Sequence, residues 1–397
     1  MRFPEFSGEW EKCKVSDLLD FYSTNSLAWE QLEYGVRGLK NLHYGLIHNG
    51  LSTCVDVDAA DLPTIKESCA PKKYTLCKEG DVAFADASED TNDVAKCVEF
   101  TNCAENSIVC GLHTIHGRDK SNKTVIGFKG YAFSAQSFRH QIRRLAQGTK
   151  IYSINSKNFS ECYIGIPSKE EQSKIATLLS LIDQRIETQK KIIEDLKKLK
   201  DAITHSHYRN ELSHSPIVYI GKYITQVSKR NKDARIDRVL SVSNKYGFIN
   251  QDEQFEDREV ASADTSKYKV VHKGDFAYNP ARINVGSVAR LHEFENGIVS
   301  PMYVCFTAKK GLLPAYFELY LSTNIFKYEM NKRLEGSVRL CLTYESLCNI
   351  KIALPELNVQ KEFVSKVSII LTKIKSEEKL LVLYHNYKQY FLSQMFI

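Results

Sequence analysis

Apolar residues recur at alternating intervals of four and three in two long stretches of this chain. These positions are Ile175, Leu179, Ile182, Ile186, Ile193, Leu196 and Ile203 in the first stretch, and Phe363, Val367, Ile370, Ile374, Leu381, Tyr384, Phe391 and Met395 in the second. Polar Gln189 and Lys200 fill the seam positions that the first stretch leaves open. The spacing predicts two uninterrupted helices, each with one narrow apolar stripe.

Two stripes of similar length in one chain can cover each other, so we expect the helices to pack as an antiparallel coiled coil. A solvent-exposed single helix and a coiled coil between two chains are the competing interpretations. A helix of about 30 residues is about 45 Å long at 1.5 Å per residue. In the internal arrangement, the pair would act as a spacer between the globular parts of the chain.

Each stretch follows a segment that occurs twice. Residues 148–167 align with residues 336–355 without a gap, and a glutamine follows five residues after each final proline. Further matches occur earlier and in the same order in both halves, so we interpret the chain as a duplication. They are Gly80-Asp81-Val82-Ala83-Phe84 with Gly274-Asp275-Phe276-Ala277-Tyr278, Val94-Ala95-Lys96 with Val288-Ala289-Arg290 at the same offset, and Tyr44-Gly45-Leu46-Ile47 with Tyr246-Gly247-Phe248-Ile249.

The start of the first helix has its own sequence signals. Pro167 ends the preceding strand, Ser168 can cap the helix, and Glu171 completes the pattern of a capping box. Pro355 has the same place in the second copy, where no Ser or Thr cap follows.

The remaining sequence predicts short strands between Gly, Asn and Asp turns, at 74–76, 82–85, 108–110, 239–242, 270–271 and 298–299. Helical stretches are expected late in each half, at 135–146 and 314–334. The expected fold class is α+β, with two pseudo-repeated β-rich domains that are each followed by a long helix. The expected boundaries are 1–165 and 209–354 for the domains, and 166–208 and 355–397 for the spacer helices.

Composition adds bounds to this interpretation. With 397 residues and 43% hydrophobic content, the chain can form two cores. No apolar run approaches the roughly 20 residues that span a bilayer, and the first six residues lack a signal peptide's apolar core, so we expect a cytoplasmic protein. The 11 cysteines show no zinc-site spacing, although Cys97, Cys103 and Cys110 come nearest to a cluster. We interpret them as reduced thiols rather than metal ligands.

The net charge of +6 is modest, and it is unevenly distributed. Residues 1–165 carry 19 basic and 21 acidic side chains, whereas residues 207–354 carry 21 basic and 16 acidic ones. Bulk charge therefore does not predict DNA binding, and local clusters have to carry that argument. The two late helical stretches both end in basic residues, which either contact phosphates or only complement the helix dipole. These residues are Arg139, Arg143, Arg144 and then Lys150 in the first half, and Lys327, Lys332, Arg333 and then Arg339 in the second.

Loop residues are the better candidates for contacts with bases, because Arg pairs bidentately with guanine and Asn with adenine. The loop at 86–93 is acidic where its counterpart in the second half is basic, so the halves are expected to recognise different sequences. The loop candidates are Arg118, Lys120, Lys123, Lys229, Arg230, Lys232, Arg235, Arg282, Asn284 and Arg290.

No catalytic motif appears in the sequence. It contains neither a phosphate-binding loop nor a dinucleotide turn, and it lacks the common hydrolase signatures. Asn279-Pro280 is followed by Ala281, which differs from the Asn-Pro-Pro-aromatic signature of amino-methyltransferases. His113 and His116 are interpreted as a surface pair rather than metal ligands. We therefore expect no catalytic residue, no metal and no cofactor.

The chain resembles the DNA-specificity subunit of Type I restriction-modification enzymes over essentially its whole length. The resemblance rests on the opening Arg2-Phe3-Pro4-Glu5-Phe6, and on the start of the first helix from Ile166-Pro167 through Glu171-Gln172 to Ile175-Ala176. The second helix start, from Leu354-Pro355 to Gln360, departs from the pattern because Val359 stands where the glutamate is expected.

The resemblance implies a non-catalytic protein with two target-recognition domains, each reading one half of a bipartite, asymmetric site in double-stranded DNA. It also implies that the helices set the gap between the half-sites, that methyltransferase subunits dock on them in two copies, and that motor/endonuclease subunits join the complex. Two other classes stay open: a coiled-coil adaptor or scaffold that does not bind DNA, and an enzyme such as a nuclease with an unrecognised motif.

Overall fold

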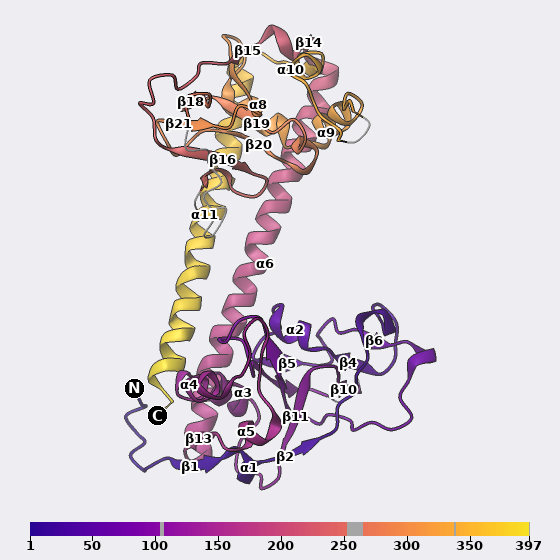
Figure 1. Ribbon diagram of the computed structural model, residues 1–397, viewed down its shortest axis with the longest axis vertical. Coiled ribbons are helices and arrows are strands. Elements are labelled where there is room, and N and C mark those ends of the chain that lie inside the picture. The colour runs from indigo at the N-terminus through magenta and orange to yellow at the C-terminus, as the bar shows by residue number, and fades with distance from the viewer. Residues whose placement is uncertain (104–106, 252–264, 337–338, 397) are drawn as a thin grey trace. The chain divides into compact units, whose positions relative to one another are not determined.

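The computed structural model describes residues 1–103, 107–251, 265–336 and 339–396, and the chain divides into two compact units. Unit 1 comprises Met1–Lys191 and Glu378–Ile397, and unit 2 comprises Ile192–Glu377. The heptad prediction of two long helices is confirmed by α6 (Lys169–His214) and α11 (Leu357–Gln394) (Figure 1). Each unit therefore contains a globular part and one portion of each long helix.

The globular part of unit 1 contains a five-stranded sheet in the order β2-β11-β7-β9-β5 and a four-stranded sheet in the order β10-β4-β6-β3. The pairs β5-β9 and β4-β10 are parallel, and the two-stranded ladders β1-β13 and β12-β8 complete the unit. The strands are β1 (Glu11–Lys14), β2 (Leu19–Tyr22), β3 (Leu32–Glu33), β4 (Lys40–Leu42), β5 (Cys54–Asp56), β6 (Thr64–Ile65), β7 (Val82–Ala85), β8 (Ala87–Ser88), β9 (Cys97–Thr101), β10 (Ile108–Cys110), β11 (Thr114–Asp119), β12 (Tyr152–Ser153) and β13 (Tyr163–Ile166). The helices are α1 (Val15–Leu18), α2 (Tyr44–His48), α3 (Phe128–Ser134), α4 (Gln136–Leu145) and α5 (Ser156–Ser160), with the short turns η1 (Trp29–Gln31) and η2 (Glu67–Cys69).

The globular part of unit 2 contains two four-stranded sheets, in the orders β15-β22-β19-β20 and β17-β16-β21-β18, and the ladder β14-β23. The pair β16-β21 is parallel. The strands are β14 (Ile217–Tyr219), β15 (Ile224–Val227), β16 (Val239–Ser243), β17 (Gly247–Asn250), β18 (Lys269–His272), β19 (Phe276–Tyr278), β20 (Val288–Arg290), β21 (Asn296–Val299), β22 (Val304–Ala308) and β23 (Lys351–Ala353). The helices are α8 (Pro314–Leu321), α9 (Asn324–Asn331) and α10 (Tyr344–Cys348), with the short turns η3 (Ile220–Lys222) and η4 (Ile283–Val285).

Strand orders correspond between the two units. The series β2-β11-β7-β9 of unit 1 has its counterpart in β15-β22-β19-β20 of unit 2, and the parallel pair β4-β10 has its counterpart in β16-β21. The ladders β1-β13 and β14-β23 both join the first strand of a unit to the strand before a long helix. Asp81 and Asp275 stand at equivalent turns, since each accepts a 2.8 Å hydrogen bond from the backbone amide three residues earlier.

A buried glutamine fixes the start of each long helix in the same way. Gln172 accepts a hydrogen bond from the Val125 amide and donates to the carbonyls of Lys123 and Pro167. Gln360 accepts from the Leu313 amide and donates to the carbonyls of Gly311 and Pro355. Both side chains are fully buried. The repeated Pro-x-x-x-x-Gln pattern thus attaches each helix to the globular part of its own unit.

Each unit also contains contacts between α6 and α11. In unit 1, Lys388 forms a 2.6 Å ion pair with Asp183, and Arg185 donates to the Tyr384 hydroxyl. In unit 2, the His207 ring stacks on Phe363 with centroids 3.7 Å apart. The first apolar seam residues are buried with each core: Ile175 and Leu179 belong to the core of unit 1, and Phe363 and Val367 to that of unit 2. Within the described residues, no helix combines the length and hydrophobicity that a membrane crossing needs.

Several sequence-based expectations were wrong in detail. Residues 74–76 form no strand apart from an isolated bridge at Leu76, and the helix expected at 314–334 is divided into α8 and α9. Thr323 causes this division, because its hydroxyl caps α9 by accepting from the Phe326 amide. The capping box at the first helix is only half formed. Ser168 accepts from the Glu171 amide, but the Glu171 carboxylate binds Arg2 at 2.7 and 2.6 Å instead of returning to the cap.

Two of the short sequence matches are not structural equivalents. Residues 44–47 lie in helix α2, where His43 accepts a hydrogen bond from the Gly45 amide. Residues 247–249 instead lie in strand β17, which follows a turn at 244–246 and begins at Gly247 with φ of +70°. The match of residues 94–96 with 288–290 is shifted. Opposite the equivalent residues Ala83 and Ala277, the ladders place Val98 and Ala289, so unit 1 has three additional residues before this strand.

Candidate nucleic-acid interface

Arg282 lies on an ordered loop of unit 2 between strands β19 and β20. Asn279 shapes this loop, because its side-chain oxygen accepts from the Ala281 amide and its carbonyl accepts from the Arg282 amide. The Arg282 carbonyl in turn accepts from the amides of Val285 and Ser287. The Arg282 side chain is exposed, and it makes no hydrogen bond or ion pair with the described residues. The backbone thus holds the arginine in place while its five donors stay available.

A cavity of about 250 Å³ lies beside this arginine. Its lining mixes hydroxyl and amide groups with a few apolar side chains, a combination that can hydrogen-bond and pack against the edge of a base. Asn284, the second candidate on this loop, is exposed within η4. The lining consists of Leu240, Ser241, Val242, Ser243, Asn244, Gln251, Tyr268, Asn279, Arg282, Val285, Ser287, Ser300, Met302 and Tyr303.

The basic run at 229–235 forms a second loop of unit 2. Asn231 is buried and holds the loop closed, since its side chain both donates to and accepts from the backbone of Ile236. Lys229, Arg230 and Lys232 are exposed around it, and their side chains form no bond with the described part of the chain. Arg235 lies 3.6 Å from Asp233. This loop presents charge in the manner of a phosphate-contacting segment.

Other candidates of unit 2 are engaged by acidic neighbours. Arg290 forms an ion pair with Glu318, with distances of 2.9 and 3.0 Å to one carboxylate oxygen, and His292 contacts the other oxygen. Glu329 binds both Arg333 at 2.7 Å and Lys332 at 3.4 Å. Lys327 and Arg339 are exposed. The structure therefore divides the basic residues of unit 2 into an available set around Arg282 and Lys229, and an internally paired set around Glu318 and Glu329.

In unit 1, the candidates that the sequence placed in a loop all have internal partners, and the placement was wrong for Arg118, which lies in strand β11. Arg118 binds Asp81 through Nε at 2.8 Å and a terminal nitrogen at 2.7 Å, and its guanidinium lies over the ring of Tyr22. Burial alone would raise the pKa of Asp81, but hydrogen bonds from His116 and Arg118 outweigh it and lower this pKa below its usual value. Lys120 donates to the Ser16 carbonyl at 2.7 Å. Lys123 forms a 2.5 Å ion pair with Glu11.

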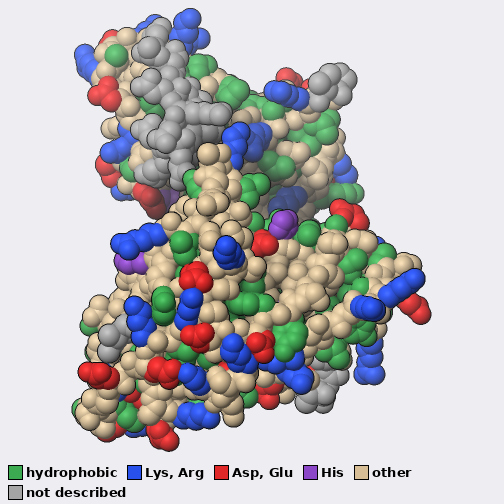
Figure 2. All heavy atoms as spheres, turned by 60° about the horizontal axis from the view of Figure 1, so that its bottom comes forward, with side chains coloured by type: hydrophobic (Ala, Val, Ile, Leu, Met, Phe, Trp, Pro, Cys, Tyr) green, Lys and Arg blue, Asp and Glu red, His purple; other side chains and the backbone are tan. Residues whose placement is uncertain are grey.

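Helix α4 carries the remaining candidates of unit 1. Arg139 donates to the backbone carbonyls of Val94 and Asn92, and Arg143 donates to the Asn92 side chain at 3.0 Å. Arg144 and Lys150 are exposed. Arg139 thus holds the segment before β9 in place. Only the residues at and after the C-terminal end of α4, Arg144 and Lys150, present basic side chains without an internal partner among the described residues. On the face of unit 1 drawn in Figure 2, Lys and Arg side chains lie interspersed with Asp and Glu.

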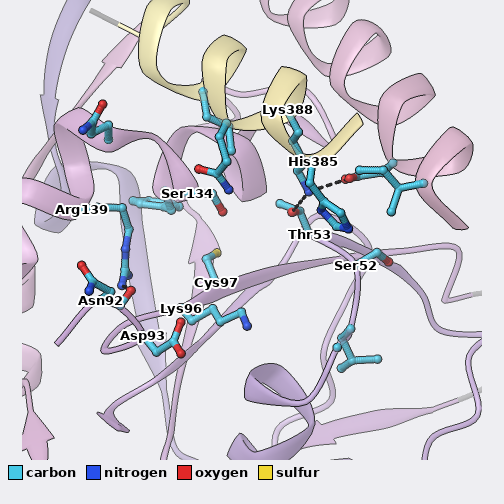
Figure 3. Close-up of a pocket in the computed structure, with 18 of the residues that line it drawn as sticks. Ser52, Thr53, Asn92, Asp93, Lys96, Cys97, Ser134, Arg139, His385 and Lys388 are labelled. Atoms are coloured by element: carbon cyan, nitrogen blue, oxygen red, sulfur yellow. Dashed lines mark hydrogen bonds and ion pairs between the residues drawn. The ribbon is translucent and has the colours of Figure 1, made fainter. Parts of the chain in front are cut away.

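Arg139 and Arg143 also line a pocket of unit 1 with a volume of about 760 Å³ (Figure 3). The opposite wall comes from α11, where Lys388 reaches both Asp183 at 2.6 Å and the Thr53 hydroxyl at 2.9 Å. Burial, with smaller contributions from the ammonium groups of Lys190 and Lys388, lowers the pKa of His385 in this wall. The pocket's cations are thus held by protein groups, and Figure 3 shows Asn92 beside Arg139 and Asp93 beside Lys96.

The two histidines that the sequence suggested as a surface pair lie in different environments. His113 is exposed and pairs with Asp86 at 3.1 Å, in agreement with the expectation. His116 is fully buried in strand β11, where its Nε2 lies 2.7 Å from Asp81, so the interpretation as a surface pair was wrong for this residue. Alternation along a strand explains the difference, since β11 turns its even-numbered positions 114 and 116 into the unit.

Sequence reasoning missed a second row of apolar side chains on α11 within unit 1. Leu380, Leu383, Tyr387 and Tyr390 follow one another at intervals of three and four, and 39–55% of each side chain is exposed. Residues at this spacing lie on one helix face. We call this row the outer stripe. A contiguous exposed apolar row on a charged helix is typical of a protein-binding surface.

Comparisons with known proteins agree with a chain of two globular parts and two long helices. Residues 54–198 match the sequence family described as Type I restriction modification DNA specificity domain. No curated protein matches the chain in sequence. The crystal structure of a Type I restriction-modification system S subunit from M. genitalium aligns over 100% of this chain and 99% of its own, with 17% identity and a TM-score of 0.55. A chain from a structure described as "Structural basis underlying complex assembly and conformational transition of the type I R-M system" aligns over 98% and 97%, with 12% identity and a TM-score of 0.57. At these identities the two alignments show a shared fold.

Proposed function

We propose that this chain reads a bipartite, asymmetric DNA site with one recognition domain in each unit. The chain belongs to the Type I restriction-modification DNA specificity family. It is a non-catalytic specificity subunit, and its fold, shared over nearly its full length with an S subunit, makes a coiled-coil adaptor without DNA binding the less favoured alternative. The structural observation that best supports DNA recognition is the Arg282 loop. A backbone-fixed arginine beside a polar cavity is suited to bidentate recognition of guanine.

The two recognition domains differ in their available charge, which supports an asymmetric site. Unit 2 presents the side chains of Arg282, Asn284, Lys229, Arg230 and Lys232 without internal partners among the described residues. In unit 1, Arg118, Lys120, Lys123, Arg139 and Arg143 are committed to internal contacts, and Arg144 and Lys150 remain. Half-sites read by such different surfaces would have different sequences. The duplication and the domain boundaries at 1–165 and 209–354 are part of this proposal.

The long helices are proposed to act as an antiparallel coiled-coil spacer that sets the gap between the half-sites. The contacts of α6 with α11 inside each unit support this role, as do the two glutamine attachments that fix each helix to its own globular part. Each helix start is held by three hydrogen bonds. A change in helix length would therefore move the attached recognition domain rather than be absorbed by a flexible connection.

A Type I specificity subunit assembles with methyltransferase and restriction subunits and binds DNA. We propose that a methyltransferase subunit docks on the helices, in two copies per chain, and that the outer stripe is part of its docking surface in unit 1. Exposed Leu and Tyr side chains at helical spacing fit the apolar face of a partner helix. The complex is proposed to act in the cytoplasm.

Replacement of Arg282 tests the recognition surface. With the chain assembled with its methyltransferase subunit, binding to a library of randomised sites is measured for Arg282→Ala at one fixed salt concentration. We expect relaxed preference at one or two positions of one half-site, by about 5- to 150-fold, which corresponds to about 1–3 kcal/mol for a lost base contact. Arg290→Ala is the matched control, because Glu318 already holds that guanidinium, and it should leave the preference unchanged. An even loss over all sequences in Arg282→Ala would refute its role in base recognition.

A further inference from the structure

Three potential metal ligands meet in the interior of unit 1. Cys77 comes from the loop before β7, Cys110 ends β10, and His116 lies in the middle of β11. All three are buried, and their ligand atoms lie within 4.8 Å of one another. Cys77 lies 33 residues before Cys110 and 39 before His116, which is why no local sequence spacing indicated a site. The cluster is distinct from the candidate DNA-contacting residues.

The distances fit three of the four ligand positions of a tetrahedral metal ion. Two thiolates bound to zinc at about 2.3 Å lie about 3.8 Å apart when the angle between them is tetrahedral. The sulfur atoms of Cys77 and Cys110 are 3.6 Å apart. A disulfide would bring them to about 2.0 Å, so the two sulfur atoms are not bonded to each other and both are available as ligands. An imidazole nitrogen at about 2.0 Å from the same ion would lie about 3.6 Å from each sulfur, within the observed limit.

His116 is oriented as metal-binding histidines usually are. Its Nε2 donates to the Asp81 carboxylate at 2.7 Å, which leaves the lone pair of Nδ1 on the side of the two sulfur atoms. Nδ1 is buried and has no hydrogen-bond partner among the described residues. Asp81 is itself held by Arg118 and by the Lys78 amide. A carboxylate behind the distal nitrogen fixes the ring and its tautomer, which is the common outer-shell arrangement at zinc sites.

We propose that Cys77, Cys110 and His116 bind one zinc ion that stabilises unit 1. Soft thiolates combined with an imidazole select zinc over the hard cations magnesium and calcium. Binding would displace one proton from each thiol, so that two thiolates balance the two charges of the ion while the imidazole stays neutral. Asp81 and Arg118 balance each other beside it. The buried group as a whole is then neutral, which removes the cost of burying a charge.

The proposed ion would reinforce a contact between the loop before β7 and β10, which are already joined by the Leu76–Val109 bridge and by the hydrogen bond from the Cys77 amide to the Ile108 carbonyl. It would link the loop before β7 to the end of β10 and to β11, and therefore the four-stranded sheet to the five-stranded sheet. Through Asp81 it would also fix Arg118.

Unit 2 serves as an internal comparison, because it repeats this region without the ligands. Val271 precedes Gly274 as Cys77 precedes Gly80, and Ser300 follows Ile298-Val299 as Cys110 follows Ile108-Val109. Cys305 lies opposite Ala277 as His116 lies opposite Ala83. Only one of the three equivalent positions keeps a strong zinc ligand. Zinc binding is therefore assigned to unit 1 alone.

Metal content of the full-length chain tests the proposal. The chain is expressed with added zinc and purified under reducing conditions without chelator, and its metal is measured by elemental mass spectrometry. We expect about one zinc per chain, falling below about a tenth of that in Cys77→Ala, Cys110→Ala and His116→Ala. Cys97→Ala is the matched control, since Cys97 is also a buried thiol of unit 1 but lies outside the cluster. A wild-type chain without zinc, or variants that all keep it, would overturn the proposal.

A second measurement remains informative if the variants fail to fold. The wild-type chain is loaded with cobalt in place of zinc, and its absorption spectrum is recorded. We expect the charge-transfer band of a cobalt–thiolate bond together with the intense visible bands of tetrahedral cobalt. A spectrum of octahedral, oxygen-bound cobalt would contradict the proposal. So would a mass two hydrogens lower with a peptide cross-link between Cys77 and Cys110, because it would show that the pair forms a disulfide instead.

Discussion

The buried glutamines at the helix starts provide a sharp test of how the long helices are attached. Gln172 makes hydrogen bonds of 2.9, 3.0 and 2.9 Å to Val125, Lys123 and Pro167, and its side chain is fully buried. Gln360 makes the equivalent bonds at 2.8, 2.9 and 2.8 Å. We predict that Gln172→Ala destabilises unit 1 and that Gln360→Ala destabilises unit 2 by a similar amount.

The expected cost follows from the number of bonds. Each lost hydrogen bond contributes about 0.5–1.5 kcal/mol, and backbone groups left buried without a partner add to this, so about 3–5 kcal/mol is expected for each variant. Gln184→Ala is the control, because Gln184 is exposed on α6. Its replacement should change stability by no more than about 0.5 kcal/mol.

Urea unfolding can assign each effect to its unit. The two tryptophans, Trp10 and Trp29, both lie in unit 1, so tryptophan fluorescence reports that unit, whereas circular dichroism reports both. Gln172→Ala should lower the midpoint of the fluorescence transition by about 1 M or more, given typical urea slopes of 1–3 kcal/mol per M. Gln360→Ala should lower the urea midpoint of unit 2, which circular dichroism detects and tryptophan fluorescence does not. If either variant loses less than about 1 kcal/mol, the glutamines do not hold the helices in place.

Three further predictions concern the helices and the repeated turn. Burial lowers the pKa of His207, and Lys366 adds to this effect while Glu211 opposes it, so protonation of His207 favours the unfolded state. The stability of unit 2 should therefore fall as pH decreases below about 6.5. In thermal unfolding, His207→Gln should remove this pH dependence, whereas His214→Gln should leave it unchanged. In the outer stripe, Tyr387→Ala should weaken methyltransferase binding in calorimetry by at least about 1 kcal/mol. Gln389→Ala is the control and should leave binding unchanged, because Gln389 is exposed on another face of α11; equal binding by both variants would remove the outer stripe from the interface. Gly148 and Gly336 have φ of +144° and +122°, and an added Cβ would overlap the carbonyl oxygen of Ile151 or Arg339, respectively. Gly148→Ala and Gly336→Ala should therefore each lower the free energy of unfolding by about 1 kcal/mol or more. Unchanged midpoints in urea unfolding would contradict this.

The helices and their attachment could be predicted from the sequence because they depend on local, periodic signals. The heptad spacing gave both long helices, and the repeated proline and glutamine marked the two starts that Gln172 and Gln360 fix. Short matches were less reliable. Tyr44-Gly45-Leu46-Ile47 forms a helix and Tyr246-Gly247-Phe248-Ile249 mainly a strand, because a cap at His43 and the pairing of β17 with β16 decide the conformation in each case.

The roles of individual basic residues could not be predicted, because they depend on partners that are distant in the sequence. Arg118 is paired with Asp81, 37 residues away, and Arg290 with Glu318, 28 residues away. Arg282 has no such partner among the described residues, although all three arginines were equal candidates by sequence. The meeting of Cys77, Cys110 and His116 was hidden for the same reason, since it results from strand pairing rather than from spacing.

The central claim is that the paired helices set the distance between two half-sites, and changing their length tests it most directly. Seven residues are inserted into α6 between Lys191 and Ile192, and seven into α11 between Glu377 and Glu378, so that both apolar stripes keep their register. The insertion lengthens each helix by about 10 Å at 1.5 Å per residue, a length that spans at most about three base pairs at 3.4 Å each. The modified bases are then mapped across a genome in cells that carry this chain and its partner subunits. The account predicts unchanged half-site sequences and a gap that is longer by one to about three base pairs. Altered half-sites, or an unchanged gap with activity retained, would contradict it.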